Sequence, residues 1–129
     1  MIKICIFNDF QLPLPPVKGG SVPNLTNFIL TENEKYKHYD IDVFSCYDKN
    51  AVQEAKKYKC SHFYFIKDAK RVRFFTNLKF LLNNKFHFKF NISEVPLPKS
   101  AKKIFLQNNY DLVYINYILT DMCEERYRL

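Results

Sequence analysis

The chain has 129 residues, of which 47% are hydrophobic and 26% are charged, and its formal net charge is +7. This length suits a single domain, and the composition is that of a chain able to bury a core, which argues against two independent domains and against disorder. No apolar run approaches the roughly 18–20 residues of a membrane span, and no signal-peptide core follows Met1, so we expect a cytoplasmic protein.

The cysteines and histidines show no spacing typical of a metal or redox site. The cysteines are Cys5, Cys46, Cys60 and Cys123, and the histidines are His38, His62 and His87. No two cysteines form a C-x-x-C pair, and two of them lie inside apolar runs. We therefore predict free thiols, no disulfide and no metal site.

The first third of the chain predicts a strand, a loop and a helix. Ile2–Phe7 is apolar apart from one lysine, which is typical of a strand buried on both faces of a parallel sheet. Residues 9–20 contain three prolines and form a loop. A helix over Ser21–Leu30 follows, with Ser21 as its N-cap. Its apolar residues at helical spacing are Val22, Leu25, Phe28 and Ile29.

Strands and helices alternate along the rest of the chain. Further strands are predicted at Ile41–Cys46, His62–Ile66 and Asp111–Asn116. Helices are predicted at Asn50–Lys59, capped by Asn50, and at Val72–Leu82, Ser100–Asn108 and Leu119–Tyr127. Residues 85–90 fit either a strand or a turn of helix. This alternation predicts an α/β fold, a Rossmann-like three-layer open parallel sheet with right-handed crossovers.

The two glycines of the chain, Gly19 and Gly20, are adjacent and lie in the first strand-to-helix loop. Average usage predicts about nine glycines in this length. In open α/β sheets this loop meets a helix N-terminus that favours an anion, and the missing Cβ atoms let a phosphate or sugar approach the backbone. Lys18 would add charge. The alternative is an ordinary turn. The loop matches neither the dinucleotide nor the P-loop motif, which disfavours both of those enzyme classes.

The order of motifs resembles the start of the family 4 glycosyltransferases with the GT-B fold. The strand Ile2–Asn8, the proline-rich segment Pro15–Val22 with its paired glycine and the strand Ile41–Phe44 follow that family's pattern. Asp111–Asn116 is similar to a later strand of the family that usually carries two histidines. Here Tyr114 and Asn116 stand in their places.

The resemblance implies a retaining, metal-independent enzyme that transfers a sugar from a nucleotide-sugar donor to a sugar or lipid-linked acceptor. The donor would be a co-substrate, and no other cofactor is implied. Such enzymes act in capsule, exopolysaccharide or glycolipid synthesis. The loop residues that would approach the donor diphosphate and the acceptor are Lys18, Gly19, Gly20 and Ser21. The family's C-terminal nucleotide-sugar domain is absent from residues 1–129. We therefore expect a single, incomplete domain that forms the acceptor-side half and does not catalyse transfer alone.

Polar residues at the carboxyl ends of the first and fourth strands are candidate acceptor contacts. Asn8 and Asp9 end the first strand, and Tyr114 and Asn116 end the fourth. Asp9 also fits a general base, or an Asx turn that only caps the loop. Ordinary packing is the alternative for the other pair. No catalytic residue can be assigned from the sequence.

A basic, phenylalanine-rich stretch fills the middle of the chain, where residues 67–103 carry ten basic and two acidic side chains. Its candidate membrane-facing residues are Lys70, Arg71, Arg73, Lys79, Lys85 and Lys89. One interpretation is peripheral docking on the anionic inner face of a membrane. The alternative is phenylalanines in the core and lysines in solvent. No nucleic-acid partner is expected, because no RNA-binding signature occurs. The rival function is a non-catalytic α/β module that binds a phosphate ligand or a partner protein.

Overall fold

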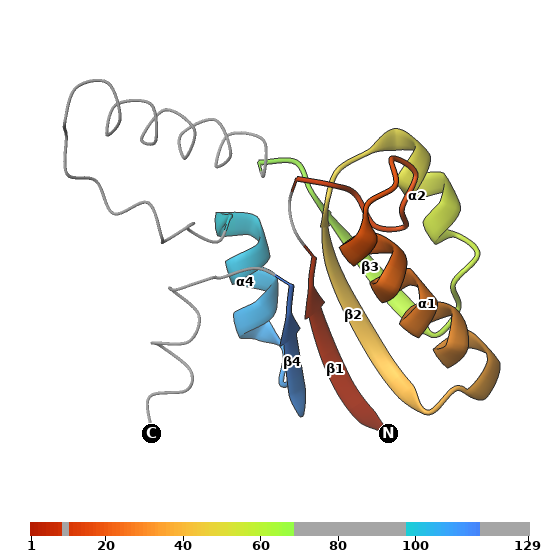
Figure 1. Cartoon of the computed structure of the whole chain (residues 1–129). Coiled ribbons are helices and arrows are strands. Elements are labelled where there is room, and N and C mark those ends of the chain that lie inside the picture. The colour runs from red at the N-terminus through yellow and green to blue at the C-terminus, as the bar shows by residue number, and fades with distance from the viewer. Residues whose placement is uncertain (9–10, 69–97, 117–129) are drawn as a thin grey trace, which may run out of the picture.

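The computed structural model describes residues 1–8, 11–68 and 98–116, which form an α/β unit around one parallel sheet (Figure 1). Its elements are β1 (Ile2–Phe7), α1 (Ser21–Tyr36), β2 (Tyr39–Cys46), α2 (Lys49–Ala55), β3 (Ser61–Ile66), α4 (Lys99–Gln107) and β4 (Leu112–Ile115). The four strands are all parallel in the order β3-β2-β1-β4. The predicted Rossmann-like α/β arrangement is confirmed.

Helices cover both faces of the sheet, with α1 and α2 on one side and α4 on the other (Figure 1). Along β1, Cys5 and Phe7 pack toward Phe105 of α4, whereas Ile6 packs toward Leu30 of α1. This double coverage explains why β1 is almost continuously apolar. Each fully buried side chain of this size contributes about 1.5–3 kcal/mol of transfer free energy.

Helix α1 buries a different face from the one that its apolar spacing indicates. Its buried residues are Pro23, Thr26, Leu30 and Asn33, whereas Val22, Leu25, Phe28 and Ile29 are 40–62% exposed. Two polar side chains on the buried face have partners. Thr26 accepts a hydrogen bond from Asn116, and the Asn33 amide exchanges two hydrogen bonds with the Tyr39 backbone. These bonds fix the rotation of α1 and leave its apolar stripe outside.

Both predicted N-caps are wrong. Gly20 is the N-cap of α1, and Ser21 is already helical. Asp48, not Asn50, is the N-cap of α2, because its carboxylate accepts hydrogen bonds from the N–H groups of Asn50 and Ala51. A carboxylate two residues earlier in the chain reaches both N–H groups, and it also suits the positive end of the helix dipole.

The remaining predicted elements agree with the structure within a few residues where the chain is described. Strands β2 and β3 begin slightly earlier than predicted, α1 continues to Tyr36, and α2 ends at Ala55. Helix α4 buries Phe105. Cys5 and Cys46 are buried, and Cys60 is partly buried. No helix within the described ranges is long and apolar enough to cross a membrane. The predictions for residues 72–82, 85–90 and 119–127, and for Cys123, lie outside the described residues.

Candidate functional site at the carboxyl edge of the sheet

The loop after β1 is anchored across the carboxyl ends of β1 and β2. The Asn8 side-chain amide donates a 2.8 Å hydrogen bond to the carbonyl of Leu12, and the Asn8 backbone N–H donates to the carbonyl of Phe44. Further along, the N–H of Leu14 donates a 2.8 Å hydrogen bond to the hydroxyl of Ser45 on β2. Because Asn8, Leu14 and Ser45 are fully buried, these bonds fix the path of the loop.

Gly19 and Gly20 both have positive φ angles, of 74° and 106°, but they have different surroundings. A Cβ on Gly20 would lie 2.6 Å from Cδ1 of Leu12 and 3.1 Å from Cδ of Pro23, so a side chain here would require these neighbours to shift. A Cβ on Gly19 would have no atom within 4 Å. The backbone of Gly19 is therefore open to a ligand, whereas Gly20 allows the positive-φ turn that leads into α1.

The open loop leads directly into the N-terminus of α1. Gly20 has no side chain to accept hydrogen bonds from the first turn, and Pro23 has no N–H to offer. The N–H groups of Ser21 and Val22 thus begin the helix without a side-chain cap. The positive end of the α1 dipole favours an anion here.

Lys18 joins this loop to the start of α2. Its ammonium lies 3.3 Å from Oδ2 of Asp48, and its side chain is 63% exposed. The N–H of Ala51, then the N–H of Asn50 and the Lys18 ammonium, hold the pKa of Asp48 below its usual range, although partial burial opposes them. A phosphate at Gly19 would compete with Asp48 for the same cation.

A polar cavity of about 550 Å³ lies between the loop, α1 and α2. The loop contributes Pro16, α1 contributes Asn27, and Gln53, Glu54 and Tyr58 come from α2 and the segment after it. The Tyr58 hydroxyl donates a hydrogen bond to Oδ1 of Asn27. Amides, a carboxylate and a phenol are suited to binding hydroxyl groups, as in a sugar. These four polar residues could not be identified from the sequence, because only the fold brings them together.

The predicted acceptor contacts are only partly described. Asn8 holds the loop, as above, and Asn116 binds Thr26 of α1 through its side chain and Phe7 of β1 through its N–H. Tyr114 is 40% exposed on β4. The predicted site residues outside the described part of the chain are Asp9, Lys70, Arg71, Arg73, Lys79, Lys85 and Lys89.

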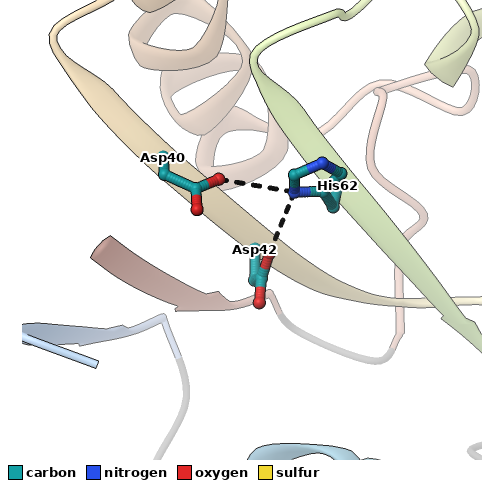
Figure 2. Close-up of side chains that lie close together, drawn as sticks. All are labelled: Asp40, Asp42 and His62. Carbon is teal, nitrogen blue, oxygen red and sulfur yellow. Dashed lines mark hydrogen bonds and ion pairs between the residues drawn. The ribbon is translucent and has the colours of Figure 1, made fainter. Parts of the chain in front are cut away.

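A second cluster lies at the opposite, amino-terminal edge of the sheet. Figure 2 shows His62 of β3 pointing toward Asp40 and Asp42 of β2, and its Nδ1 lies 3.4 and 3.2 Å from one oxygen of each. Asp42 and His62 are register partners, and Asp40 is two residues earlier on the same face. The D-x-D spacing is visible in the sequence, but the strand register that adds His62 is not.

The other carboxylate oxygen of Asp42 is held separately. The Tyr110 hydroxyl donates a 2.7 Å hydrogen bond to Oδ2, and the Lys3 ammonium lies 3.5 Å from the same atom. Burial, and then the hydrogen bond to Asp42, raise the pKa of Tyr110 well above its usual range, so the phenol stays protonated as a donor. The Asp42 side chain is 1% exposed, and these partners stabilise its buried charge.

No protein-family model, curated protein or solved structure matches this chain. The resemblance to family 4 glycosyltransferases therefore rests on the residues of the loop and strands.

Proposed function

We propose that this chain is the N-terminal, acceptor-side domain of a retaining GT-B glycosyltransferase, which transfers a sugar from a nucleotide-sugar donor in surface polysaccharide or glycolipid synthesis. The observation that carries the proposal is the open backbone of Gly19 beside the uncapped N-terminus of α1. Both lie at the carboxyl edge of a parallel sheet, where ligands of open α/β folds bind.

In this proposal the loop stabilises the leaving diphosphate. Negative charge grows on the diphosphate as its bond to the sugar breaks. The N–H groups at the start of α1 and the helix dipole are fixed donors for that charge, so they need no reorganisation during the reaction. Gly19 lets the phosphate approach because no side chain lies above it. Lys18 adds a cation that can turn from Asp48 to the phosphate.

The polar cavity beside the loop is the proposed acceptor pocket. Asn27 and Gln53 supply amide donors and acceptors for sugar hydroxyls, and the Tyr58 ring supplies an apolar face for the sugar ring. Glu54 forms an ion pair with Lys57, so it offers a carboxylate whose charge is partly balanced. The nucleoside of the donor is assigned to a second α/β domain.

The proposal is tested by transfer assays with the polypeptide that the gene encodes, including any coding sequence that follows Leu129. The membrane lipid fraction serves as acceptor, with a panel of labelled nucleotide sugars. Gly19→Val should lower transfer at least about 100-fold, as loss of a preorganised oxyanion contact does. Lys37→Val is a matched control, because Lys37 also has a positive φ, of 54°, but caps the far end of α1. Equal loss in both variants would contradict the loop assignment.

One observation favours the rival function, a non-catalytic binding module. The apolar stripe of α1, formed by Val22, Leu25, Phe28 and Ile29, is exposed within the described part of the chain. Exposed apolar patches of this kind often mark protein-protein contacts. Absence of transfer by the complete polypeptide, together with normal folding, would favour this module over the enzyme.

A further inference from the structure

We propose that Asp40, Asp42 and His62 bind a divalent transition-metal ion, with Zn²⁺ the preferred species, at the amino-terminal edge of the sheet. The site is independent of the proposed transferase function, because it lies at the opposite edge from Gly19. It would join β2 to β3, so its expected effect is on stability.

The spacing of the three ligand atoms fits a tetrahedral ion. Zinc lies about 2.0–2.1 Å from a histidine nitrogen and about 2.0–2.2 Å from a carboxylate oxygen, which places two ligands of a tetrahedron roughly 3.3 Å apart. Nδ1 of His62 is 3.2 Å from Oδ1 of Asp42 and 3.4 Å from Oδ1 of Asp40. The three residues together offer ligand atoms that all lie within 4.8 Å of one another.

At this cluster the number of acceptor atoms exceeds the number of protons that can be donated to them. Nδ1 of His62 carries at most one proton, yet two carboxylate oxygens converge on it (Figure 2). Of the two carboxylates, Asp42 is almost fully buried; Tyr110 and Lys3 bind its Oδ2, and His62 is the partner of its Oδ1. An ion in the position of that proton would contact Nδ1 and both oxygens together.

The surroundings supply the second shell that metal sites require. Tyr110 and Lys3 bind Oδ2 of Asp42, which orients the carboxylate and leaves Oδ1 facing His62. Lys3 also offsets part of the negative charge. Hard ions such as Mg²⁺ and Ca²⁺, which are held by carboxylate charge, are therefore disfavoured relative to ions that imidazole binds well.

The site also has access for an ion and for a fourth ligand. Asp40 and His62 line a cavity of about 610 Å³ at this edge of the sheet, and Lys3, Lys37 and Lys59 also line it. The His62 side chain is 62% exposed, so an ion reaches Nδ1 without opening the core. Water would complete the four-coordinate site, as it does at zinc centres with three protein ligands.

The test uses the full 129-residue chain, freed of metal with a chelator, and Zn²⁺ alone as the probe. We expect one Zn²⁺ per chain by calorimetry and a saturable rise of roughly 5 °C in the melting temperature. His62→Ala and Asp40→Asn should each weaken binding at least tenfold. His38→Ala is the control, because His38 is exposed and stacks on Tyr36, outside the cluster, and this variant should bind like the parent chain.

Cobalt absorption distinguishes this site from thiol binding. Co²⁺ at the proposed site should give visible bands of a four-coordinate ion without a thiolate charge-transfer band. A thiolate band, unchanged binding in His62→Ala, or no binding by the parent chain would overturn the proposal. Circular dichroism of both variants checks that they remain folded. If His62→Ala is unstable, Zn²⁺ binding by Asp40→Asn still tests the site, because this change alters only a half-buried side chain.

Discussion

Asn116, directly after β4, donates a 2.9 Å hydrogen bond from its side-chain amide to the hydroxyl of Thr26 on α1. The Thr26 hydroxyl in turn donates to the carbonyl of Val22 in the first turn of α1. The end of β4 is thereby connected to the helix start beside the glycine loop. This connection holds the proposed diphosphate contact in place across the sheet.

Removing that connection should destabilise the domain. Asn116→Ala leaves the buried Thr26 hydroxyl without its donor, so we expect a loss of about 1–2 kcal/mol in the free energy of unfolding. Urea denaturation measures the loss. Asn24→Ala is the control, because Asn24 is exposed on the same helix and should change stability little. Equal stability of parent and Asn116→Ala would show that the hydrogen bond contributes nothing.

The two glycines should differ in their tolerance of alanine. Both have positive φ, which costs an alanine roughly 1–2 kcal/mol, but only Gly20 adds a clash with Leu12 and Pro23. We expect Gly20→Ala to lower the free energy of unfolding at least about 1 kcal/mol more than Gly19→Ala does. Adding Leu12→Ala should reduce that difference, which a double-mutant cycle measures. A larger effect at Gly19 would contradict the assigned packing.

Asp48 should make α2 sensitive to acid. Its pKa is lower in the folded state, so its stabilising contribution is present above the unfolded pKa of about 3.9 and is lost as pH falls through the folded pKa. Asp48→Asn keeps a capping oxygen but cannot titrate. Between pH 6 and pH 3 the parent chain should therefore lose more stability than this variant. Parallel pH profiles of unfolding free energy would contradict the prediction.

The Tyr110 hydroxyl should stabilise the buried carboxylate of Asp42. Tyr110→Phe removes a 2.7 Å hydrogen bond to a charged acceptor, and we expect a loss of about 1.5–3 kcal/mol. Tyr114→Phe is the matched control, because Tyr114 is exposed on β4 and should change stability within about 0.5 kcal/mol. Chemical denaturation of both variants provides the comparison.

The strands were predictable because helices cover both faces of the sheet, so a run such as Ile2–Phe7 is apolar apart from Lys3. The buried face of α1 was not predictable, because Thr26 and Asn33 are buried through hydrogen bonds to residues outside the helix. Spacing alone selects apolar residues and cannot identify such partners.

The candidate sites, too, were predictable only where their residues are neighbours in the sequence. The glycine loop could be recognised in the sequence as Pro15–Gly20. The distinct roles of its two glycines could not, because they depend on how Leu12 and Pro23 pack beside Gly20. Asp42 and His62 are twenty residues apart and meet only through the register of β2 with β3. Because β2 and β3 each carry more than one polar residue, the sequence does not specify that register.

The most direct test of the proposed function is NMR titration of the 15N-labelled chain with nucleotide sugars, with the corresponding nucleosides as the control. Gly19 and Gly20 are its two glycines, so their amide signals fall in a distinct spectral region and report on the loop. The account predicts saturable shifts of these two signals and of Ser21 with nucleotide sugars and with pyrophosphate, and none with nucleosides. Unchanged glycine signals at millimolar nucleotide sugar and pyrophosphate would contradict it.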